Sequence, residues 1–300
     1  MTTTSLPAQA LTGPTVPRRQ LGRHLRALRN QAKLTTRLAA QALEWSEPKL
    51  WRIETGQTAL RSLDVEAMCR VYGASTEVTE GLMVLARETR TAGWWHPHDD
   101  AIPDWLDLYP GLEEAACRVQ GYDPELVPGL LQTADYARTV LQAEHPDVGE
   151  EELARRAQAR VARQALLVRV TAPLTAELLI GEAVLRRPVG GAQVMAEQLG
   201  QLAEAALLPN VSIRVVPLRN GLHRGVVSGP FVILRFPVNG DGHDGEPPVV
   251  YVPGFTGALY LERSGEIHRY HEVYADTAAT ALDETATRDL LLKAARSFEQ

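Results

Sequence analysis

LTTRLAAQALEWSEPKLWRIETG, residues 34–56, carries the clearest structural signal in this chain. Thr35 and Ser46 are residue types that cap helix N-termini, because their hydroxyl oxygen accepts a hydrogen bond from a backbone N–H of the first turn. Pro48 follows Ser46 in the first turn, where its missing N–H costs nothing. The stretch therefore predicts two short helices joined by a tight turn around Glu44.

The side-chain pattern predicts which face of each helix is buried. Ala39 and Ala40 are small and let a second helix cross closely, and Leu50 and Ile53, three residues apart, share one face. The opposite face at the front of the second helix then carries Glu47, Lys49 and Arg52. We interpret these exposed residues near the start of the helix as the candidate surface for ligand recognition.

An exposed helix front with cationic side chains suits the major groove of DNA. Lys49 and Arg52 have donors for guanine O6 and N7, and Glu47 either accepts from cytosine N4 or favours the helix dipole. Thr36 and Arg37, in the first turn of the preceding helix, have donors for a phosphate oxygen. The front of one helix and the start of the other, together with the capping residues Thr35 and Ser46, thus form one predicted DNA-binding site.

Apolar residues recur at helical spacing on both sides of this stretch. The repeats predict five short helices over residues 18–90, an all-α domain of helix-turn-helix type, with Leu21, Leu38 and Leu63 among the periodic positions. Residues 1–17 contain prolines and no charged side chain, so we expect a disordered leader.

The charge is distributed unevenly along the chain. Residues 18–61 hold ten lysines and arginines against three glutamates, which gives this segment a net charge of +7. Because the whole chain has a net charge of −6, the remaining residues carry −13. A basic segment on an acidic protein indicates one part that faces a polyanion. The alternative interpretation is a basic, solvated helix face with no ligand.

Residues 25–73 resemble the Cro/C1 (XRE) family of DNA-binding domains. The resemblance rests on the opening LRALR, the second helix LTTRLAAQAL, the serine that starts the next helix and the ending RIETG at Gly56. It implies a Cro/repressor-type fold in which Lys49 and Arg52 approach bases while Gln57 and Thr58 approach the DNA backbone.

The same resemblance implies a structural role for Glu54 and leaves one position open. Glu54 is expected to pair with an arginine of the first helix, for which Arg26 and Arg29 are both suitable. Trp51 stands where the family often has serine or lysine. We expect the Trp51 side chain to pack either against a DNA sugar or against the fourth helix.

After a junction at residues 91–111, the hydrophobic period changes. Short runs rich in branched and aromatic residues, bounded by proline and glycine, predict strands, and they alternate with helical segments. We therefore expect an α+β domain over residues 112–300 with a small, mostly antiparallel sheet. The strands are expected at 174–180, 211–216, 231–236, 249–252 and 258–261, and the helices at 112–119, 133–144, 150–170, 194–206, 267–281 and 284–298.

The second domain is similar to the C-terminal domain of actinobacterial antitoxin-like, or WhiJ-like, regulators. The resemblance rests on segments such as VPGLLQTADYARTVL, QLGQLAEAALLPNVSIRVVPL and VVYVPGFTGALYLE. It implies a domain that binds a partner or effector, with a small acidic protein encoded nearby as the candidate partner. Pro253 follows VVYV at a position where the family often has an acidic residue.

Motifs for catalysis are incomplete. His96 and His98 with Asp99 and Asp100 are a conceivable metal set, and His268 and His271 lie one helical turn apart, but none forms a full ligand signature. No nucleophile elbow, phosphate loop or dinucleotide fingerprint is present. We therefore expect no enzymatic activity, no cofactor and no metal.

These patterns together predict a cytoplasmic, nucleoid-associated transcription regulator that binds double-stranded DNA as a homodimer. No run approaches the roughly 18 apolar residues of a membrane-spanning helix, so no membrane association is expected. The first alternative is an antitoxin-like interaction module whose DNA binding is secondary. Others are a regulator that senses a small molecule and an enzyme fused to a DNA-binding domain.

Overall fold

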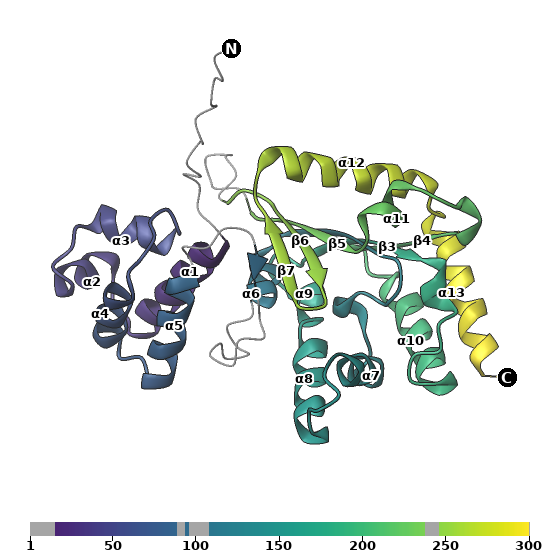
Figure 1. Cartoon of the computed structure of the whole chain (residues 1–300), viewed down its shortest axis with the longest axis horizontal. Helices are drawn as coiled ribbons and strands as arrows, with labels where there is room; N and C mark the ends of the chain where they lie inside the picture. Colours follow the sequence, from purple (N-terminus) through teal and green to yellow (C-terminus); the bar gives the residue numbers. More distant parts are fainter. Residues whose placement is uncertain (1–15, 89–93, 96–107, 238–245, 300) are drawn as a thin grey trace, which may run out of the picture. The chain divides into compact units, whose positions relative to one another are not determined.

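The computed structural model of the chain describes residues 16–88, 94–95, 108–237 and 246–299. The chain divides into two compact units, Met1–Leu108 and Tyr109–Gln300, which we describe separately (Figure 1). The predicted leader up to residue 15, the His96, His98, Asp99 and Asp100 set, and most of the glycine-rich loop after residue 237 lie outside the described residues.

The first unit is helical. Its first helix begins at Val16, which is buried, so Val16 and Pro17 belong to a helix and not to the predicted leader. A two-residue strand, β1 (Trp94–Trp95), follows the helices in the sequence. The helices are α1 (Val16–Gln31), α2 (Thr36–Ala42), α3 (Glu47–Glu54), α4 (Ser62–Tyr72) and α5 (Thr76–Glu88).

The core of this unit contains most of the predicted apolar positions. Leu21 and Leu50 are fully buried, but Leu38 is 46% exposed and Leu63 is 74% exposed, so these two periodic positions do not lie in the core. The reason is that α2 and α4 each bury only one face. In α2 that face is supplied by the small Ala39 and Ala40, which leaves Leu38 on the outside.

The second unit contains a mixed sheet. Its strands within this unit follow the order β7-β6-β5-β2-β3-β4. The pairings β2 with β3 and β3 with β4 are parallel, and the other three are antiparallel. The strands are β2 (Arg118–Asp123), β3 (Thr175–Gly181), β4 (Val211–Val216), β5 (Phe231–Arg235), β6 (Val249–Gly254) and β7 (Gly257–Leu261).

Strand β2 corrects the prediction of a helix over residues 112–119. Helix α6 (Leu108–Ala115) ends earlier, and β2 lies at the centre of the sheet between β5 and β3. Its polar and glycine residues give a weak strand signal. Cross-strand contacts compensate, because Arg118 and Gln120 both donate to the carboxylate of Glu177 on β3.

Helices cover the sheet. Helix α12 lies across one face (Figure 1), where Ile267 packs in a cluster with Tyr122, Phe231 and Ile233 of the strands. The predicted helix over 150–170 is interrupted, since α8 ends at Ala162 and a short α9 follows. The remaining helices are α7 (Ala134–Glu144), α8 (Glu150–Ala162), α9 (Ala165–Val168), α10 (Ala192–Ala205), α11 (Arg224–Ser228), α12 (Ser264–Thr280) and α13 (Glu284–Phe298), with 3-10 turns at Gly129–Leu131, Glu182–Leu185 and Leu218–Asn220.

The β4 edge of the sheet is closed by the segment that leads into α13. The backbone N–H of Leu282 donates to the carbonyl of Val215 at 2.8 Å, and the N–H of Val215 donates to the hydroxyl of Thr287 at 3.0 Å. Satisfied edge groups oppose pairing with another chain.

Candidate nucleic-acid interface

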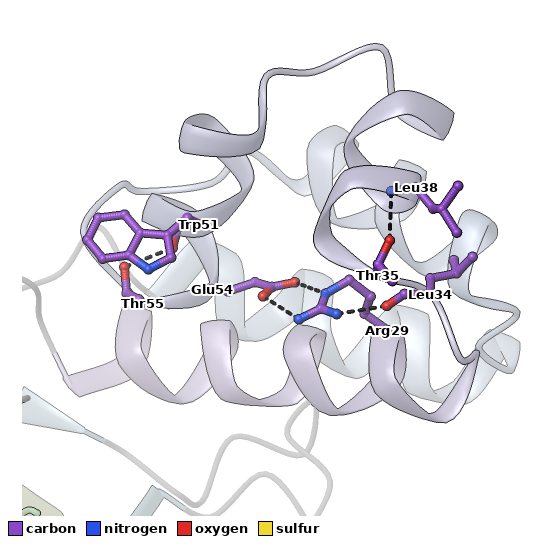
Figure 2. A network of polar contacts seen from close by, with 7 residues as sticks. All are labelled: Arg29, Leu34, Thr35, Leu38, Trp51, Glu54 and Thr55. Carbon is purple, nitrogen blue, oxygen red and sulfur yellow. Dashed lines mark hydrogen bonds and ion pairs between the residues drawn. The ribbon is translucent and has the colours of Figure 1, made fainter. Parts of the chain in front are cut away.

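A buried ion pair joins α1 to the last turn of α3 (Figure 2). Arg29 Nε donates to Glu54 Oε1 at 2.6 Å and Nη2 to Oε2 at 2.9 Å, and both residues are buried. Arg29 Nη1 also donates to the carbonyl of Leu34 at 2.8 Å, which fixes the segment entering α2. Of the two arginines suitable for Glu54, the partner is Arg29, while Arg26 is exposed.

The hydrogen bond with Glu54 raises the pKa of Arg29, although burial acts in the opposite direction. The bidentate geometry therefore compensates for removing the guanidinium from water. Because one side chain holds α1, the start of α2 and the end of α3, it sets how the two helices of the motif lie relative to each other.

The predicted caps at both helix starts are confirmed. Thr35 Oγ1 accepts from the N–H of Leu38 at 3.2 Å, and Ser46 Oγ accepts from the N–H of Lys49 at 3.3 Å. The turn between the helices passes through Glu44 at φ 56°, a left-handed conformation that favours glycine. The sequence of the turn gave no sign of this conformation.

Two glycines allow α1 and the end of α3 to approach closely. A Cβ atom on Gly22 would lie 2.7 Å from the carbonyl oxygens of Ile53 and Glu54. Gly56 has φ +72°, and a Cβ there would lie 2.7 Å from the Cα of Arg19. Backbone contacts of this kind leave no room for a side chain, so both positions require glycine.

The side chains predicted to contact DNA lie on the surface of this unit. Glu47 in the first turn of α3 and Arg52 in its last turn are exposed, and Lys49 is half-buried. The exposed members of the predicted set are Thr35, Arg37, Ser46, Glu47, Arg52, Gln57 and Thr58, and the half-buried members are Thr36 and Lys49.

The two predicted base-reading cations differ in their surroundings. The ammonium of Lys49 lies 3.6 Å from the centre of the Trp45 ring, a cation–π contact. The guanidinium of Arg52 is exposed and donates through Nε to the carbonyl of Pro48 at 3.3 Å, one helical turn earlier. Arg52 is therefore the more accessible cation, and Lys49 must leave an aromatic ring to reach a ligand.

Trp51 is an exposed aromatic residue on α3. Its exposed fraction is 54%, and in Figure 2 its ring lies beside Thr55, whose hydroxyl donates to the Trp51 carbonyl at 2.8 Å. A side chain this exposed is not a core residue, so packing inside this unit does not account for it.

The basic charge counted in the sequence is not all on the surface. Arg19 is 2% exposed and Arg29 is paired with Glu54, so neither guanidinium is available on the surface. The exposed positive charge is consequently smaller than the segment total. It is carried by residues that include Arg26, Lys33, Arg37, Arg52 and Arg61.

In the second unit, the arginines of α8 and the following turn bind within the protein. Arg163 makes a bidentate pair with the buried Glu113 at 2.7 and 2.9 Å, and Arg160 donates to Gln132. Arg155 and Arg156 share Glu152, which lowers the pKa of that carboxyl to about 2. The contacts of Arg160 and Arg163 tie this segment to its neighbours, whereas those of Arg155 and Arg156 stay within α8.

The two histidines of α12 have separate partners: His268 faces Glu272, and His271 faces Arg235. Within the described part of the chain, no three His, Cys, Asp or Glu side chains are grouped to hold a metal ion. Over the same residues, no helix has the length and apolar character needed to cross a membrane.

Comparisons with known proteins give one family match in each unit. A helix-turn-helix domain matches residues 20–82, and a domain of unknown function (DUF5753) matches residues 106–293. Among curated proteins, no sequence matches. Among solved structures, the clp gene regulator ClgR from C. glutamicum is similar at 26% identity, covering 27% of this chain and 100% of that chain with a TM-score of 0.21. Since the DUF5753 match spans more than half of the 300 residues, the chain belongs to the family defined by this domain of unknown function and carries a helix-turn-helix domain before it.

Proposed function

We propose that this protein is a sequence-specific DNA-binding regulator of transcription. The observation that carries the proposal is the exposed front of α3, which is held in place by the buried Arg29–Glu54 pair. A rigid helix with exposed polar and cationic side chains has the form of an element that reads a major groove.

In this proposal α3 supplies base contacts and its flanks supply backbone contacts. Arg52 is the principal base reader, because its guanidinium is exposed and its planar fork suits guanine O6 and N7. Lys49 is the second base reader. Glu47, exposed in the first turn of α3, either accepts from cytosine N4 or favours the helix dipole. The contacts to phosphates come from the start of α2 and the loop after α3, through Thr35, Thr36, Arg37, Gln57 and Thr58, with Ser46 at the start of α3.

We propose that the protein binds DNA as a homodimer. Helix α3 has eight residues and is therefore about 12 Å long, which is enough to face only a few base pairs. Two copies on half-sites about one turn of DNA apart double the sequence that is read.

The second unit is proposed to tune DNA binding through a small protein partner, as in an antitoxin-like regulator or a repressor. Several exposed apolar side chains support a protein ligand, since large apolar side chains grouped on a surface mark interaction sites. Leu218, Leu222, Val226 and Val227 lie close together in the sequence and are 52–81% exposed.

The test of DNA binding is fluorescence anisotropy of the full chain against its own upstream DNA and a scrambled duplex, over a salt series. Arg52→Ala is expected to cost about 1–3 kcal/mol on the upstream DNA only, whereas a lost phosphate contact weakens both duplexes equally. Arg70→Ala is the control, because Arg70 is an exposed arginine in the last turn of α4. Equal, weak binding to both duplexes by every variant would refute the proposal.

The partner proposal is tested by co-expressing the chain with small acidic proteins encoded beside its gene. A stable complex on size-exclusion chromatography is expected, and Leu222→Asp combined with Val227→Asp should dissociate it. If the double variant still forms the complex, the partner binds to another surface of the protein. If no complex forms, the proposal of control by a protein partner is refuted, while the proposal of DNA binding is unaffected.

A further inference from the structure

Two arginines face each other across the antiparallel pair β2–β5. Arg118 and Arg235 are direct register partners, so their side chains project from the same face of the sheet. Directly opposed residues have Cβ atoms about 4.5–5.5 Å apart, and like charges in that position are destabilising. This arrangement is unfavourable unless negative charge lies nearby.

The described surroundings supply only part of that negative charge. Arg118 pairs with Glu177, which also accepts from Gln120. Arg235 has no carboxylate within ion-pair distance among the described residues, and its Nη2 lies 3.2 Å from Nε2 of His271. The described residues thus supply one carboxylate for two guanidinium groups, and that carboxylate accepts from Arg118 and Gln120 but not from Arg235.

His271 does not add a third positive charge at neutral pH. Partial burial of this α12 side chain lowers its pKa, and the neighbouring Arg235 and His268 lower it further. The neutral ring accepts a hydrogen bond through Nε2, so it orients Arg235 without neutralising it. The remaining donors of Arg235 are available for an anion.

The two arginines are accessible from solvent. The side chain of Arg118 is 45% exposed, and Arg235 is also exposed. Thr175 on β3 is the register partner of Arg118 on its other side, which extends the row on this face with a hydroxyl-bearing residue. The row Arg235, Arg118 and Thr175 thus presents donors beside α12.

We propose that this row binds an oxyanion, the carboxylate or phosphate group of a small molecule. Planar guanidinium groups bind both kinds of oxyanion by paired, charge-assisted hydrogen bonds. An oxyanion between Arg118 and Arg235 removes their mutual repulsion and satisfies donors that Glu177 does not reach. The site belongs to the second unit and does not depend on DNA binding.

The experiment is thermal unfolding of the full chain at pH 7.5 in sodium chloride, sodium phosphate or sodium succinate at equal ionic strength. A bound anion raises the Tm with its concentration, and the probe with the larger effect identifies phosphate or carboxylate as the preferred group. Because phosphate also stabilises proteins by exclusion from their surface, the informative quantity is the difference between wild type and variant.

Arg235→Gln is expected to abolish the specific rise in Tm while leaving the Tm in chloride equal or higher, since it removes a repulsion. A purely structural arginine would instead lower the Tm in chloride. Arg269→Gln is the matched control, because Arg269 is exposed on the same helix as His271 and should keep the wild-type response.

Calorimetric titration with the more effective probe measures affinity directly. Arg235→Gln and Arg118→Gln should each weaken binding about tenfold or more, as expected for a lost hydrogen bond between charged groups. The proposal is overturned if neither probe exceeds chloride in the wild type, or if Arg235→Gln responds to the anions as Arg269→Gln does.

Discussion

The Nε atom of Arg29 lies 2.6 Å from a carboxylate oxygen of Glu54, 25 positions later in the chain, and this pair links α1 to α3 inside the first unit. Both side chains are nearly buried, at 8% and 5% exposure. A buried charge that loses its partner is costly, whereas an exposed pair contributes little. The orientation of α3 thus depends on a contact that never reaches the surface.

Replacing Arg29 tests this dependence. Arg29→Met is expected to lower the free energy of unfolding of the first unit by about 3–5 kcal/mol, because Glu54 remains buried without a partner. Arg70→Met, which breaks the exposed pair with Glu66, should cost about 1 kcal/mol or less. Urea unfolding followed by circular dichroism, fitted with one transition per unit, measures both. Similar losses for the two variants would contradict the argument.

Gly22 is expected to tolerate no side chain. Gly22→Ala should destabilise the first unit by about 1–3 kcal/mol, because the new methyl group meets two carbonyl oxygens at the end of α3. Gly200→Ala is the control: Gly200 lies inside α10 with no atom within 4 Å of the added Cβ, so it should stabilise by about 0.5–1 kcal/mol. Opposite signs in thermal unfolding are the expected result, and equal signs would refute the close approach.

Glu44 holds a left-handed conformation in the turn of the motif. Glu44→Gly should stabilise the first unit by up to about 1 kcal/mol, since the relief of backbone strain exceeds the added freedom of the unfolded chain. Ala42→Gly, in the last turn of α2, should instead destabilise by about 1 kcal/mol. Chemical denaturation of both variants distinguishes the two positions, and a loss of stability in Glu44→Gly would mean that the glutamate side chain stabilises the turn.

Trp51 is expected to contribute to ligand contact and not to folding. Trp51→Ala should leave the Tm nearly unchanged, because the side chain is 54% exposed, and should weaken binding to specific DNA by about 1–3 kcal/mol. Leu63→Ala, also at an exposed apolar residue, should change neither quantity. Anisotropy and thermal unfolding measure the two effects. A large drop in Tm for Trp51→Ala would show that the indole packs in the unit.

Asp123, at the end of β2, gives the second unit a pH dependence. Burial raises its pKa to about 7, from 3.8 for an unperturbed group. Between these values the native state binds more protons than the unfolded state, so stability falls as the pH rises towards 7. Asp123→Asn should therefore raise the Tm at pH 8 relative to the wild type, with a smaller difference at pH 5.

The control for this variant is an exposed carboxylate of the same unit. Asp147→Asn should follow the wild-type profile, because Asp147 lies on the surface in the turn before α8. Thermal unfolding at pH 5 and pH 8 provides the comparison. A constant difference between Asp123→Asn and the wild type at both pH values would show that Asp123 does not titrate in this window.

Much of the helix-turn-helix was predictable because its signals are local. The caps Thr35 and Ser46, the proline in the first turn of α3 and the spacing of Leu50 and Ile53 act within one or two helical turns. The same holds for five of the strands and most helices of the second unit, whose hydrophobic period can be recognised without knowing their neighbours. The roles of the individual DNA-contacting side chains remain predictions.

Other features depend on residues far apart in the chain. Periodicity does not distinguish Arg26 from Arg29 as the partner of Glu54, since the choice depends on how α1 crosses α3. Strand β2 has a weak local signal and is stabilised by its neighbours on both sides. The opposition of Arg118 and Arg235 exists only because β2 and β5 pair in one register. Local chemistry therefore specifies the elements, whereas charge pairing and exposure follow from the packing that brings distant segments together.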